Sequence, residues 1–394
     1  MNPSSKKSVQ FDCDIFCNVI DNYGDIGVCW RLARQLANEY GLAVRLWVDD
    51  LHSFAKLCKG ANCALAQQCC AGVEVCVWDK NFPHVQPADM VIEAFACKLP
   101  QNYLEAMAKQ LPQPAWVNLE YLSAEDWVHE CHALPSPHPT LALTKYFFFP
   151  GFTPATGGLL VERDLLVRRD AFQNDAEQQR NFWQSLSMEI PASDTLKISL
   201  FAYENAALHN LFDSWINSPK AILCLVPEGR ILAQVGEYFN KAVSVGSECV
   251  RGNLSVRVLP FITQENYDFL LWACDVNFVR GEDSFVRAQW AGRQLVWQIY
   301  PQHDDVHYAK LEAFLTLYTA KLSPTARFAV SDLWMAWNQG EDAGKAWPDF
   351  ANDFNGLGEH ALAWSKELSK NNLALNLLDL CQNIGRIRAF KIEG

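Results

Sequence analysis

The chain has 394 residues, half of them hydrophobic, and its 33 lysines and arginines against 45 aspartates and glutamates give a formal net charge of −12. This length predicts two to three domains. The 14 tryptophans and 23 phenylalanines exclude a largely disordered chain. The negative charge argues against a broad nucleic-acid surface, because phosphate neutralisation needs clustered lysine and arginine.

The 14 cysteines do not indicate a disulfide framework. The polar start of the chain lacks the apolar core of a signal peptide, no apolar stretch is long enough to predict a membrane span, and a chain of this size needs no covalent staples. We therefore expect reduced thiols, a cytoplasmic location and a disordered tail over residues 1–10.

Two segments carry residue types that can ligate a metal. The cysteine-rich segment 58–76 has no Cys-x-x-Cys pair, the spacing that a zinc site normally requires, so we expect no metal there. His303, Asp304, Asp305 and His307 are also ligand-type residues, but a polar loop that enters a helix is the favoured interpretation.

Apolar runs alternate with helical patterns from the start of the chain. Asp14–Ile20 predicts a buried strand. Residues 28–40 predict a helix, because apolar side chains recur on one face and Gly41 follows as a C-terminal glycine. The other elements predicted in this half are strands at Ala43–Val48, Val73–Trp78, Met90–Ala94, Trp116–Leu119 and Lys145–Phe149, and a helix at Tyr103–Leu111.

The same alternation begins again at Leu196. The predicted strands are Leu196–Ala202, Ala221–Val226, Val256–Leu259, Val276–Val279 and Leu295–Ile299, and the predicted helices are Ala206–Ile216, Gln264–Ala273, Ser284–Ala291 and a helical region at Leu362–Leu380. Two alternations predict an α/β protein with two facing Rossmann-like domains and a ligand cleft between them. We expect domains at residues 11–165 and 196–360, a helical connection at 166–195, and C-terminal helices at 361–394 that pack back on the body.

The first segment that can carry chemistry is DNYGDIG, Asp21–Gly27, a predicted glycine-containing turn that follows the first predicted strand. Open α/β sheets bind ligands at this edge. Gly24 and Gly27 allow close backbone approach, and Asp21 and Asp25 could orient or deprotonate a nucleophile. A turn whose aspartate caps the next helix explains the pattern equally well. The segment lacks the Gly-x-Gly-x-x-Gly fingerprint of dinucleotide sites.

The second segment is RGEDSF, residues 280–285, between a predicted strand and a predicted helix. The N–H groups at the helix start would bind an anion, with Ser284 as a cap or donor. Glu282 would repel phosphate but can accept hydrogen bonds from sugar hydroxyls. The pattern suits a nucleoside diphosphate, while a simple capped helix is the alternative.

Aromatic residues follow two strands of the second half. Phe201 and Tyr203 end one strand, and Phe261 and Gln264 follow another. Because both strand ends should open onto one crevice, a flat base could lie among the rings, with Gln264 at its polar edge. Each residue alone is more often part of a core or a rim.

Five segments carry a family resemblance: DIFCNVIDNYGDIGVCWRLARQL, VIEAFAC, NLEYLSAEDW, FFPGFTPATGGLL and VRGEDSFVRAQWAGRQLVWQIYPQ. Together they resemble the EarP family of bacterial protein-arginine rhamnosyltransferases, over essentially the whole chain from about residue 11. The resemblance implies a GT-B glycosyltransferase fold. It also implies inverting transfer of rhamnose from dTDP-β-L-rhamnose to an arginine nitrogen of translation elongation factor P, without a metal or cofactor. The modified factor rescues ribosomes stalled at polyproline.

The resemblance also implies roles for individual residues. The first domain becomes the acceptor side and the second the nucleotide-sugar side, with Asp25, Asp21 and Glu282 as catalytic residues. The implied donor-binding residues are Asn22, Tyr23, Gly24, Phe201, Tyr203, Phe261, Gln264, Tyr267, Arg280, Gly281, Glu282, Asp283 and Ser284.

The residues fit this chemistry. A guanidinium is a poor nucleophile that stays protonated in proteins, and carboxylates bind it through paired, charge-assisted hydrogen bonds. We choose Asp25 as the base because it lies nearer the helix start, with Asp21 orienting the acceptor. Their division of roles stays open, since two such groups can titrate as a pair. The alternatives are a GT-B enzyme or epimerase that uses another nucleotide sugar, and a non-catalytic nucleotide-sugar-binding protein.

Overall fold

The computed structural model describes residues 12–20, 23–301 and 306–384. The chain divides into two compact units, which are described separately. Unit 1 comprises Met1–Glu162 and Asn371–Gly394, and unit 2 comprises Arg163–Lys370. Unit 1 is therefore built from two separate stretches of sequence, with unit 2 between them.

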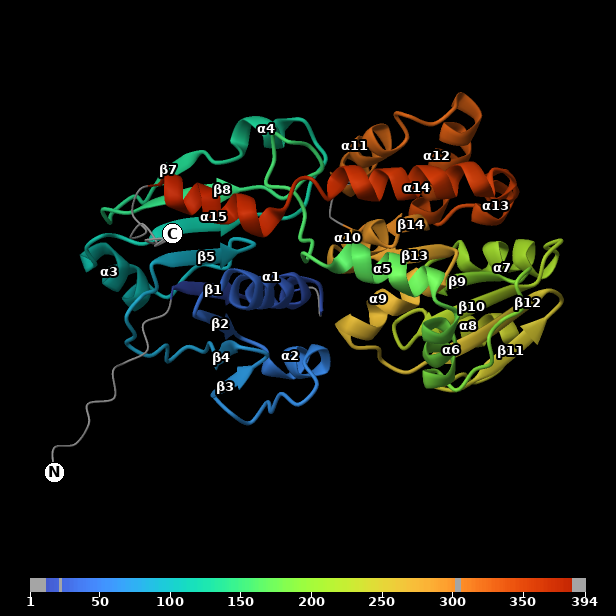
Figure 1. The fold of residues 1–394 in the computed structure, drawn as a ribbon, viewed down its shortest axis with the longest axis horizontal. Helices are drawn as coiled ribbons and strands as arrows, with labels where there is room; N and C mark the ends of the chain where they lie inside the picture. Colours follow the sequence, from blue (N-terminus) through green and yellow to red (C-terminus); the bar gives the residue numbers. More distant parts are fainter. Residues whose placement is uncertain (1–11, 21–22, 302–305, 385–394) are drawn as a thin grey trace. The chain divides into compact units, whose positions relative to one another are not determined.

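Both units alternate strands and helices (Figure 1). The elements of unit 1 are β1 Cys13–Cys17, α1 Gly24–Tyr40, β2 Val44–Val48, α2 Leu51–Leu57, β3 Gln67–Cys70, β4 Val73–Val77, β5 Met90–Ala94, α3 Gln101–Lys109, β6 Ala115–Leu119, α4 Trp127–Cys131, β7 Pro135–Pro137, β8 Thr144–Phe148 and α15 Leu373–Asn383. The elements of unit 2 are α5 Leu165–Asn174, α6 Ala176–Ser185, β9 Leu196–Leu200, α7 Leu208–Ile216, β10 Ile222–Pro227, α8 Leu232–Phe239, β11 Glu248–Arg251, β12 Leu254–Leu259, α9 Gln264–Ala273, β13 Val276–Arg280, α10 Asp283–Trp290, β14 Gln294–Gln298, α11 Val306–Tyr318, α12 Pro324–Gln339, α13 Ala343–Asn352 and α14 Phe354–Leu368.

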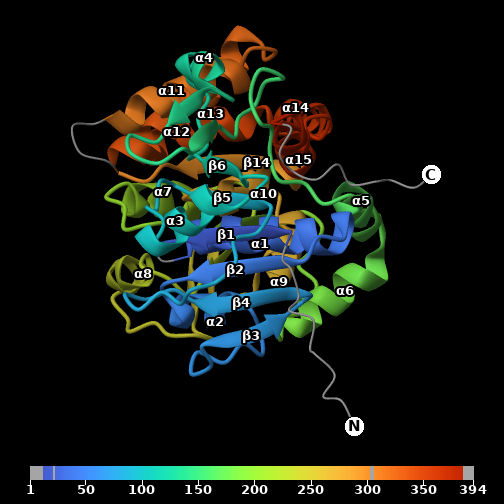
Figure 2. The same cartoon turned by 90° about the vertical axis from the view of Figure 1, so that its left-hand side faces the viewer.

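The sheet of unit 1 has the strand order β3-β4-β2-β1-β5-β6-β8-β7. Figure 2 shows β6, β5, β1, β2, β4 and β3 stacked in this order. The outer pairs β3–β4 and β7–β8 are antiparallel, and the strands between them are parallel. Every residue of β1, β2, β5 and β6 is buried, as expected for parallel strands covered on both faces.

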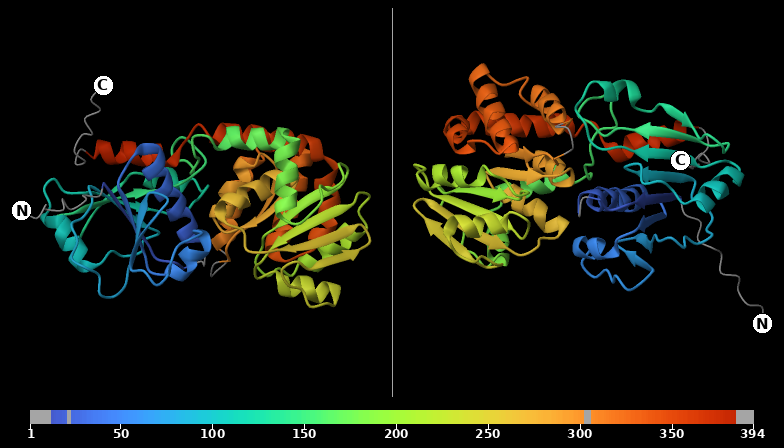
Figure 3. Two further views of the ribbon diagram at one scale, coloured as in Figure 1. Left: turned by 60° about the horizontal axis from the view of Figure 1, so that its bottom comes forward. Right: turned by 180° about the vertical axis from the view of Figure 1, so that it is seen from behind.

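The sheet of unit 2 has the strand order β11-β12-β10-β9-β13-β14. Among the described strands of this sheet, β11 alone pairs antiparallel, and helices lie on both sides of the sheet (Figure 3). In each unit the strand order reverses at one place, between β1 and β5 in unit 1 and between β9 and β13 in unit 2. These switch points are where open α/β sheets bind ligands, outside the carboxyl ends of the strands.

The predicted alternation of strands and helices is confirmed, with one correction that concerns the candidate site. The segment Gly24–Gly27, expected to be a turn, is the first turn of α1. Its backbone is already helical, because the N–H of Gly27 donates to the carbonyl of Tyr23 at 2.9 Å. Asp25 therefore belongs to the helix and does not lie in the loop before it.

The C-terminal helical segment is divided between the units. The predicted region Leu362–Leu380 is two helices, α14 in unit 2 and α15 in unit 1. Leu159 and Asn372 form a parallel bridge, and the N–H of Leu373 donates to the carbonyl of Leu159 at 3.0 Å. This bridge fixes the start of α15 to the end of the first stretch of unit 1.

A buried carboxylate joins three elements of unit 1. Asp14 on β1 accepts two hydrogen bonds from the guanidinium of Arg45 on β2, at 2.6 and 2.7 Å, and one from the indole of Trp47 at 3.2 Å. The hydroxyl of Tyr103 on α3 also donates to it. Burial, and then the charge of Asp14, raise the pKa of Tyr103, so this phenol stays protonated. The cluster ties α3 to the middle of the sheet.

A second buried ion pair joins α9 to α10 in unit 2. Arg287 donates to both carboxylate oxygens of Asp268, at 2.8 and 2.6 Å, and the two side chains are 1% and 5% exposed. Breaking such a pair on one side leaves an uncompensated buried charge. The pair therefore fixes α10, whose first residues are the end of the RGEDSF segment.

No helix within the described ranges is both long and apolar enough to cross a membrane.

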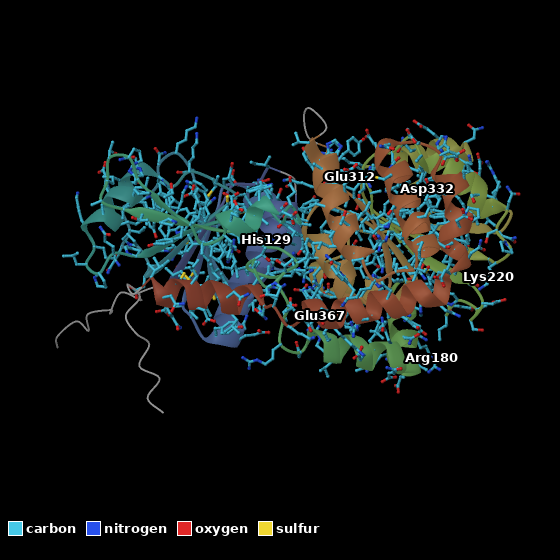
Figure 4. The ribbon with its side chains drawn as sticks, turned by 90° about the horizontal axis from the view of Figure 1, so that it is seen from above. His129, Arg180, Lys220, Glu312, Asp332 and Glu367 are labelled. Atoms are coloured by element: carbon cyan, nitrogen blue, oxygen red, sulfur yellow. The ribbon has the colours of Figure 1, made fainter. Side chains whose placement is uncertain are left out.

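We predict that Asp268→Asn lowers the free energy of unfolding by about 3–5 kcal/mol, because Arg287 keeps its buried charge without a partner. Chemical denaturation followed by tryptophan fluorescence measures the change. The control is Glu367→Gln on α14, labelled in Figure 4, whose pair with Lys370 is 58% and 70% exposed. That variant should change stability by less than about 1 kcal/mol. Equal effects of the two substitutions would contradict the prediction.

Candidate functional site

The sequence-predicted site residues fall into two groups, one at the switch point of each unit. In unit 1, Tyr23, Gly24 and Asp25 follow β1. Asp21 and Asn22, also predicted for this group, lie outside the described residues. In unit 2 the predicted residues form three sets at the ends of three strands. Phe201 and Tyr203 follow β9, residues 261–267 follow β12, and residues 280–284 lie at the end of β13. The two groups are described in turn.

Asp25 is held as an oriented carboxylate in the first turn of α1. It is 3% exposed. Its Oδ2 accepts a hydrogen bond from the N–H of Ile20 at 2.8 Å, and its Oδ1 accepts one from the hydroxyl of Tyr121 at 3.2 Å. The positive end of the helix dipole also favours a negative charge in this turn. The aspartate is not the N-cap, a position that Tyr23 occupies without a side-chain cap bond.

Tyr121 is the residue of this group that sequence reasoning missed. It lies two residues after β6 and is 38% exposed. The segment NLEYLSAEDW contains it, but nothing in the sequence links it to Asp25, which lies 96 residues away. The link arises only when the parallel sheet brings the ends of β1 and β6 to one edge.

The cysteine thiols near Asp25 are poor candidates for a catalytic nucleophile. Cys17 and Cys29 are both buried, and a hydrogen bond with Cys29, then burial, raise the pKa of Cys17. Burial also raises the pKa of Cys97. A thiol with a raised pKa is a weak nucleophile, because the thiolate is the reactive form.

In unit 2, the RGEDSF segment forms the end of β13 and the start of α10. Gly281 has φ +61°, Glu282 is the N-cap residue and Asp283 is the first helical residue. The hydroxyl of Ser284 donates to the carbonyl of Arg280 and accepts from its N–H at 3.2 Å. Ser284 thus closes the turn and leaves the first N–H groups of α10 in the position of an anion site.

Arg280 is the positive charge of this site. Its guanidinium carbon lies 4.6 Å from the ring centre of Phe201 and 4.3 Å from that of Tyr203. The residue is 8% exposed, and its Nε has no hydrogen-bond partner among the described residues. A buried guanidinium with an unused donor is prepared to bind an anion.

The other predicted residues lie on the same side of the sheet. Tyr267 packs edge-on against Phe201, with ring centres 5.7 Å apart. Gln264 is buried, and its amide donates to the carboxylate of Asp283 at 3.2 Å. Burial, and then the charge of Asp283, raise the pKa of Tyr267, so the phenol is neutral. Phe261 is half-buried after β12. The structure therefore brings the three sets of unit 2 together.

The two metal candidates of the sequence differ in how far the structure describes them. In the part of the chain that the structure describes, no group of three or more histidine, cysteine, aspartate or glutamate side chains is arranged to hold a metal ion. None of the 14 cysteines forms a disulfide bond, and burial raises the pKa of Cys76, in the cysteine-rich segment, to about 12. His303, Asp304 and Asp305 lie outside the described residues, while His307 is a buried residue of α11.

Comparison with known proteins gives one consistent result. The family model for Elongation-Factor P (EF-P) rhamnosyltransferase EarP matches residues 13–382. The chain is 51% identical over 372 residues to a protein-arginine rhamnosyltransferase of Pseudomonas putida, covering 94% of this chain and 98% of that protein. It is 43% identical over 387 residues to a protein-arginine rhamnosyltransferase of Shewanella oneidensis, covering 94% and 96%.

Solved structures agree with the fold. A structure that gives the structural basis for EarP-mediated arginine glycosylation of translation elongation factor EF-P is 38% identical, has a TM-score of 0.68, and covers 94% of this chain and 98% of that one. A glycosyltransferase of Rickettsia africae, 9% identical with a TM-score of 0.51 and covering 97% and 100%, shares the fold alone. The predicted GT-B fold is confirmed.

We predict that Arg280→Gln weakens the binding of pyrophosphate, used as an anionic probe, at least about tenfold, because a hydrogen bond to a charged group contributes about 1.5–3 kcal/mol. Isothermal titration calorimetry measures the dissociation constant. The control is Arg257→Gln on β12, whose partner Glu248 is 57% exposed. This variant removes the same charge from unit 2 and should bind pyrophosphate normally. Unchanged binding by Arg280→Gln would show that the guanidinium has only a structural role.

Proposed function

The chain belongs to the EarP family of elongation factor P rhamnosyltransferases, and we propose that it transfers L-rhamnose from dTDP-β-L-rhamnose to an arginine nitrogen of elongation factor P. As a member of this family it is a glycosyltransferase and a protein-arginine rhamnosyltransferase. The observation that supports a nucleoside-diphosphate donor is the site of unit 2. There the buried guanidinium of Arg280 lies beside aromatic rings at the start of α10.

Unit 2 binds the donor in this proposal. The aromatic residues Phe201, Phe261 and Tyr267 hold the thymine, since a flat base packs on such rings. Arg280 and the first N–H groups of α10 bind the diphosphate, and Glu282 accepts hydrogen bonds from sugar hydroxyls. These groups stabilise the negative charge that develops on the leaving diphosphate. A guanidinium and aligned N–H groups supply the positive charge, so we propose a reaction without a metal or cofactor.

Unit 1 supplies the base. The guanidino nitrogen of the acceptor forms a bond to the anomeric carbon as the bond from that carbon to the diphosphate oxygen breaks. The electron pair of the broken bond leaves with dTDP, and the proton of the nitrogen passes to the carboxylate of Asp25. Attack from the face opposite the leaving group inverts the anomeric centre, which converts a β-linked donor into an α-rhamnosyl arginine. Asp21 would orient the acceptor.

The biological role follows from the acceptor. We propose that the rhamnosylated factor rescues ribosomes stalled at polyproline, and that the enzyme works in the cytoplasm, where the translation machinery is found. The proposed partners are therefore a folded protein, elongation factor P, as the acceptor and a small molecule, the dTDP-sugar, as the donor.

The test is to incubate the enzyme with dTDP-β-L-rhamnose and elongation factor P and to weigh the factor by intact-mass spectrometry. We expect a gain of one deoxyhexose, located on an arginine by fragmentation, with the α configuration assigned by NMR. UDP-sugars in parallel reactions should give no product. Turnover of a UDP-sugar would identify a different donor. Donor binding without a mass gain on the acceptor would identify a non-catalytic binding protein.

We predict that Asp25→Asn lowers the transfer rate by about 10²–10⁴-fold, because the amide cannot accept the proton. The dissociation constant for dTDP-β-L-rhamnose, measured by calorimetry, should stay unchanged, since we assign the thymine and the diphosphate to residues of unit 2 and give Asp25 only the proton transfer. The control is Asp79→Asn in the same unit, where the exposed carboxylate accepts only a turn hydrogen bond from Asn81 at 2.7 Å among the contacts described. A parallel loss of donor affinity in Asp25→Asn would rule out a role as base.

A further inference from the structure

The hydroxyl of Tyr121 donates to Oδ1 of Asp25 across 3.2 Å, from a different strand end. We propose that Tyr121 is a positioning residue, which turns the carboxylate of Asp25 toward the acceptor nitrogen and holds it there. This inference rests on the proposed function, because it concerns the residue assigned there as the base. It adds a residue from the β6 end of the sheet to the catalytic apparatus.

The ring of Tyr121 is fixed by a stacked partner. Phe95, directly after β5, lies parallel to it, with ring centres 4.4 Å apart and planes 16° apart. Phe95 is 7% exposed and has φ +54°, a left-handed conformation that a bulky residue rarely adopts. With this backbone conformation the Phe95 ring stacks on the Tyr121 ring. Neighbouring hydrogen bonds hold the conformation in place.

Three hydrogen bonds hold the backbone on both sides of the stack. The N–H of Phe95 donates to the carbonyl of Leu119 at 2.7 Å, and the N–H of Ala96 donates to the side-chain oxygen of Asn118 at 3.0 Å. The N–H of Glu120 donates to the carbonyl of Phe148 at 2.9 Å. The ends of β5, β6 and β8 are thereby joined, so the Tyr121 hydroxyl is carried by a rigid support, as a precise site requires.

Both oxygens of Asp25 are oriented by hydrogen bonds from different segments. Ile20 donates to Oδ2 from the segment after β1, and Tyr121 donates to Oδ1 from beyond β6. The terminal torsion of an aspartate has a broad minimum, so loss of the tyrosine hydroxyl would remove one of the contacts that set the orientation of this carboxylate.

The contact also determines how the carboxylate titrates. The titratable groups that face Asp25 in the described chain include the phenol of Tyr121 after β6 and the thiol of Cys17 on β1, with Cys29 of α1 behind it. A hydroxyl that donates to a carboxylate stabilises its charged form and lowers its pKa. Removal of the hydroxyl therefore raises the pKa of Asp25. Because the base must be ionised, the acidic limb of the pH–rate profile should move to higher pH.

The test is Tyr121→Phe, which removes the hydroxyl and keeps the stack on Phe95. We expect kcat to fall about tenfold, the KM for the donor to stay unchanged, and the acidic limb of the kcat profile to move upward. The control is Tyr146→Phe on β8, for which we expect normal kinetics. Normal kcat in Tyr121→Phe would overturn the proposal. A lower kcat would also overturn the proposal if the acidic limb of the pH profile did not move and the melting temperature fell. Tyr121 would then have only a structural role.

A second readout is independent of catalysis. The carboxyl carbon resonance that Asp25→Asn removes can be titrated by NMR in the protein without donor or acceptor. We expect its pKa to be higher in Tyr121→Phe than in the unchanged protein. If the pKa of Asp25 rises in Tyr121→Phe but the unchanged protein shows no transferase activity, the contact is real and the proposed function is wrong. If the unchanged protein is active and this pKa does not move, the positioning role alone is overturned.

Discussion

Parallel pairing of buried strands is the constraint on which both sites depend. Parallel strands all end at one edge of their sheet, so residues that are distant in sequence meet there whenever they follow such strands. In unit 1 this edge brings Asp25, after β1, to Tyr121, after β6. In unit 2 it brings Phe201, after β9, to Arg280, the last residue of β13. The helices that follow β1 and β13 add their N-terminal N–H groups at the same edge.

The two sites differ in how they use that edge. In unit 2 the groups are encoded locally: the side chain that closes the turn, the N-cap and the first helical residue are consecutive from Glu282 to Ser284. In unit 1 the orientation of Asp25 depends on contacts to other strand ends, and those strand ends are in turn fixed to one another. A diphosphate can be bound by a contiguous loop, whereas a directed proton transfer needs a support built from several strands.

This difference explains what could be predicted from sequence. The strands were predictable because buried parallel strands are short apolar runs, and the residues of unit 2 because they directly follow those runs. The first turn of α1 was wrongly predicted as a turn, since Gly24, Asp25 and Gly27 have the composition of a loop. The helices α11 to α13 were missed. α11 has apolar residues on all sides and so shows no clear amphipathic pattern, and α13 contains Pro348, a residue that normally interrupts a helix. Tyr121 could not be predicted, because its role depends on a contact that only the tertiary fold creates.

The bridge between Leu159 and Asn372 has a consequence for the order in which the protein is completed. Unit 2 is an insertion in unit 1, so the ribosome finishes all of unit 2 before it releases the helix α15 that unit 1 needs. Domains usually fold as they emerge, the first one first. Here the unit that emerges first is the last to gain its full set of elements. A nascent chain that stops before residue 371 can therefore contain every strand of both sheets and still lack a complete first unit.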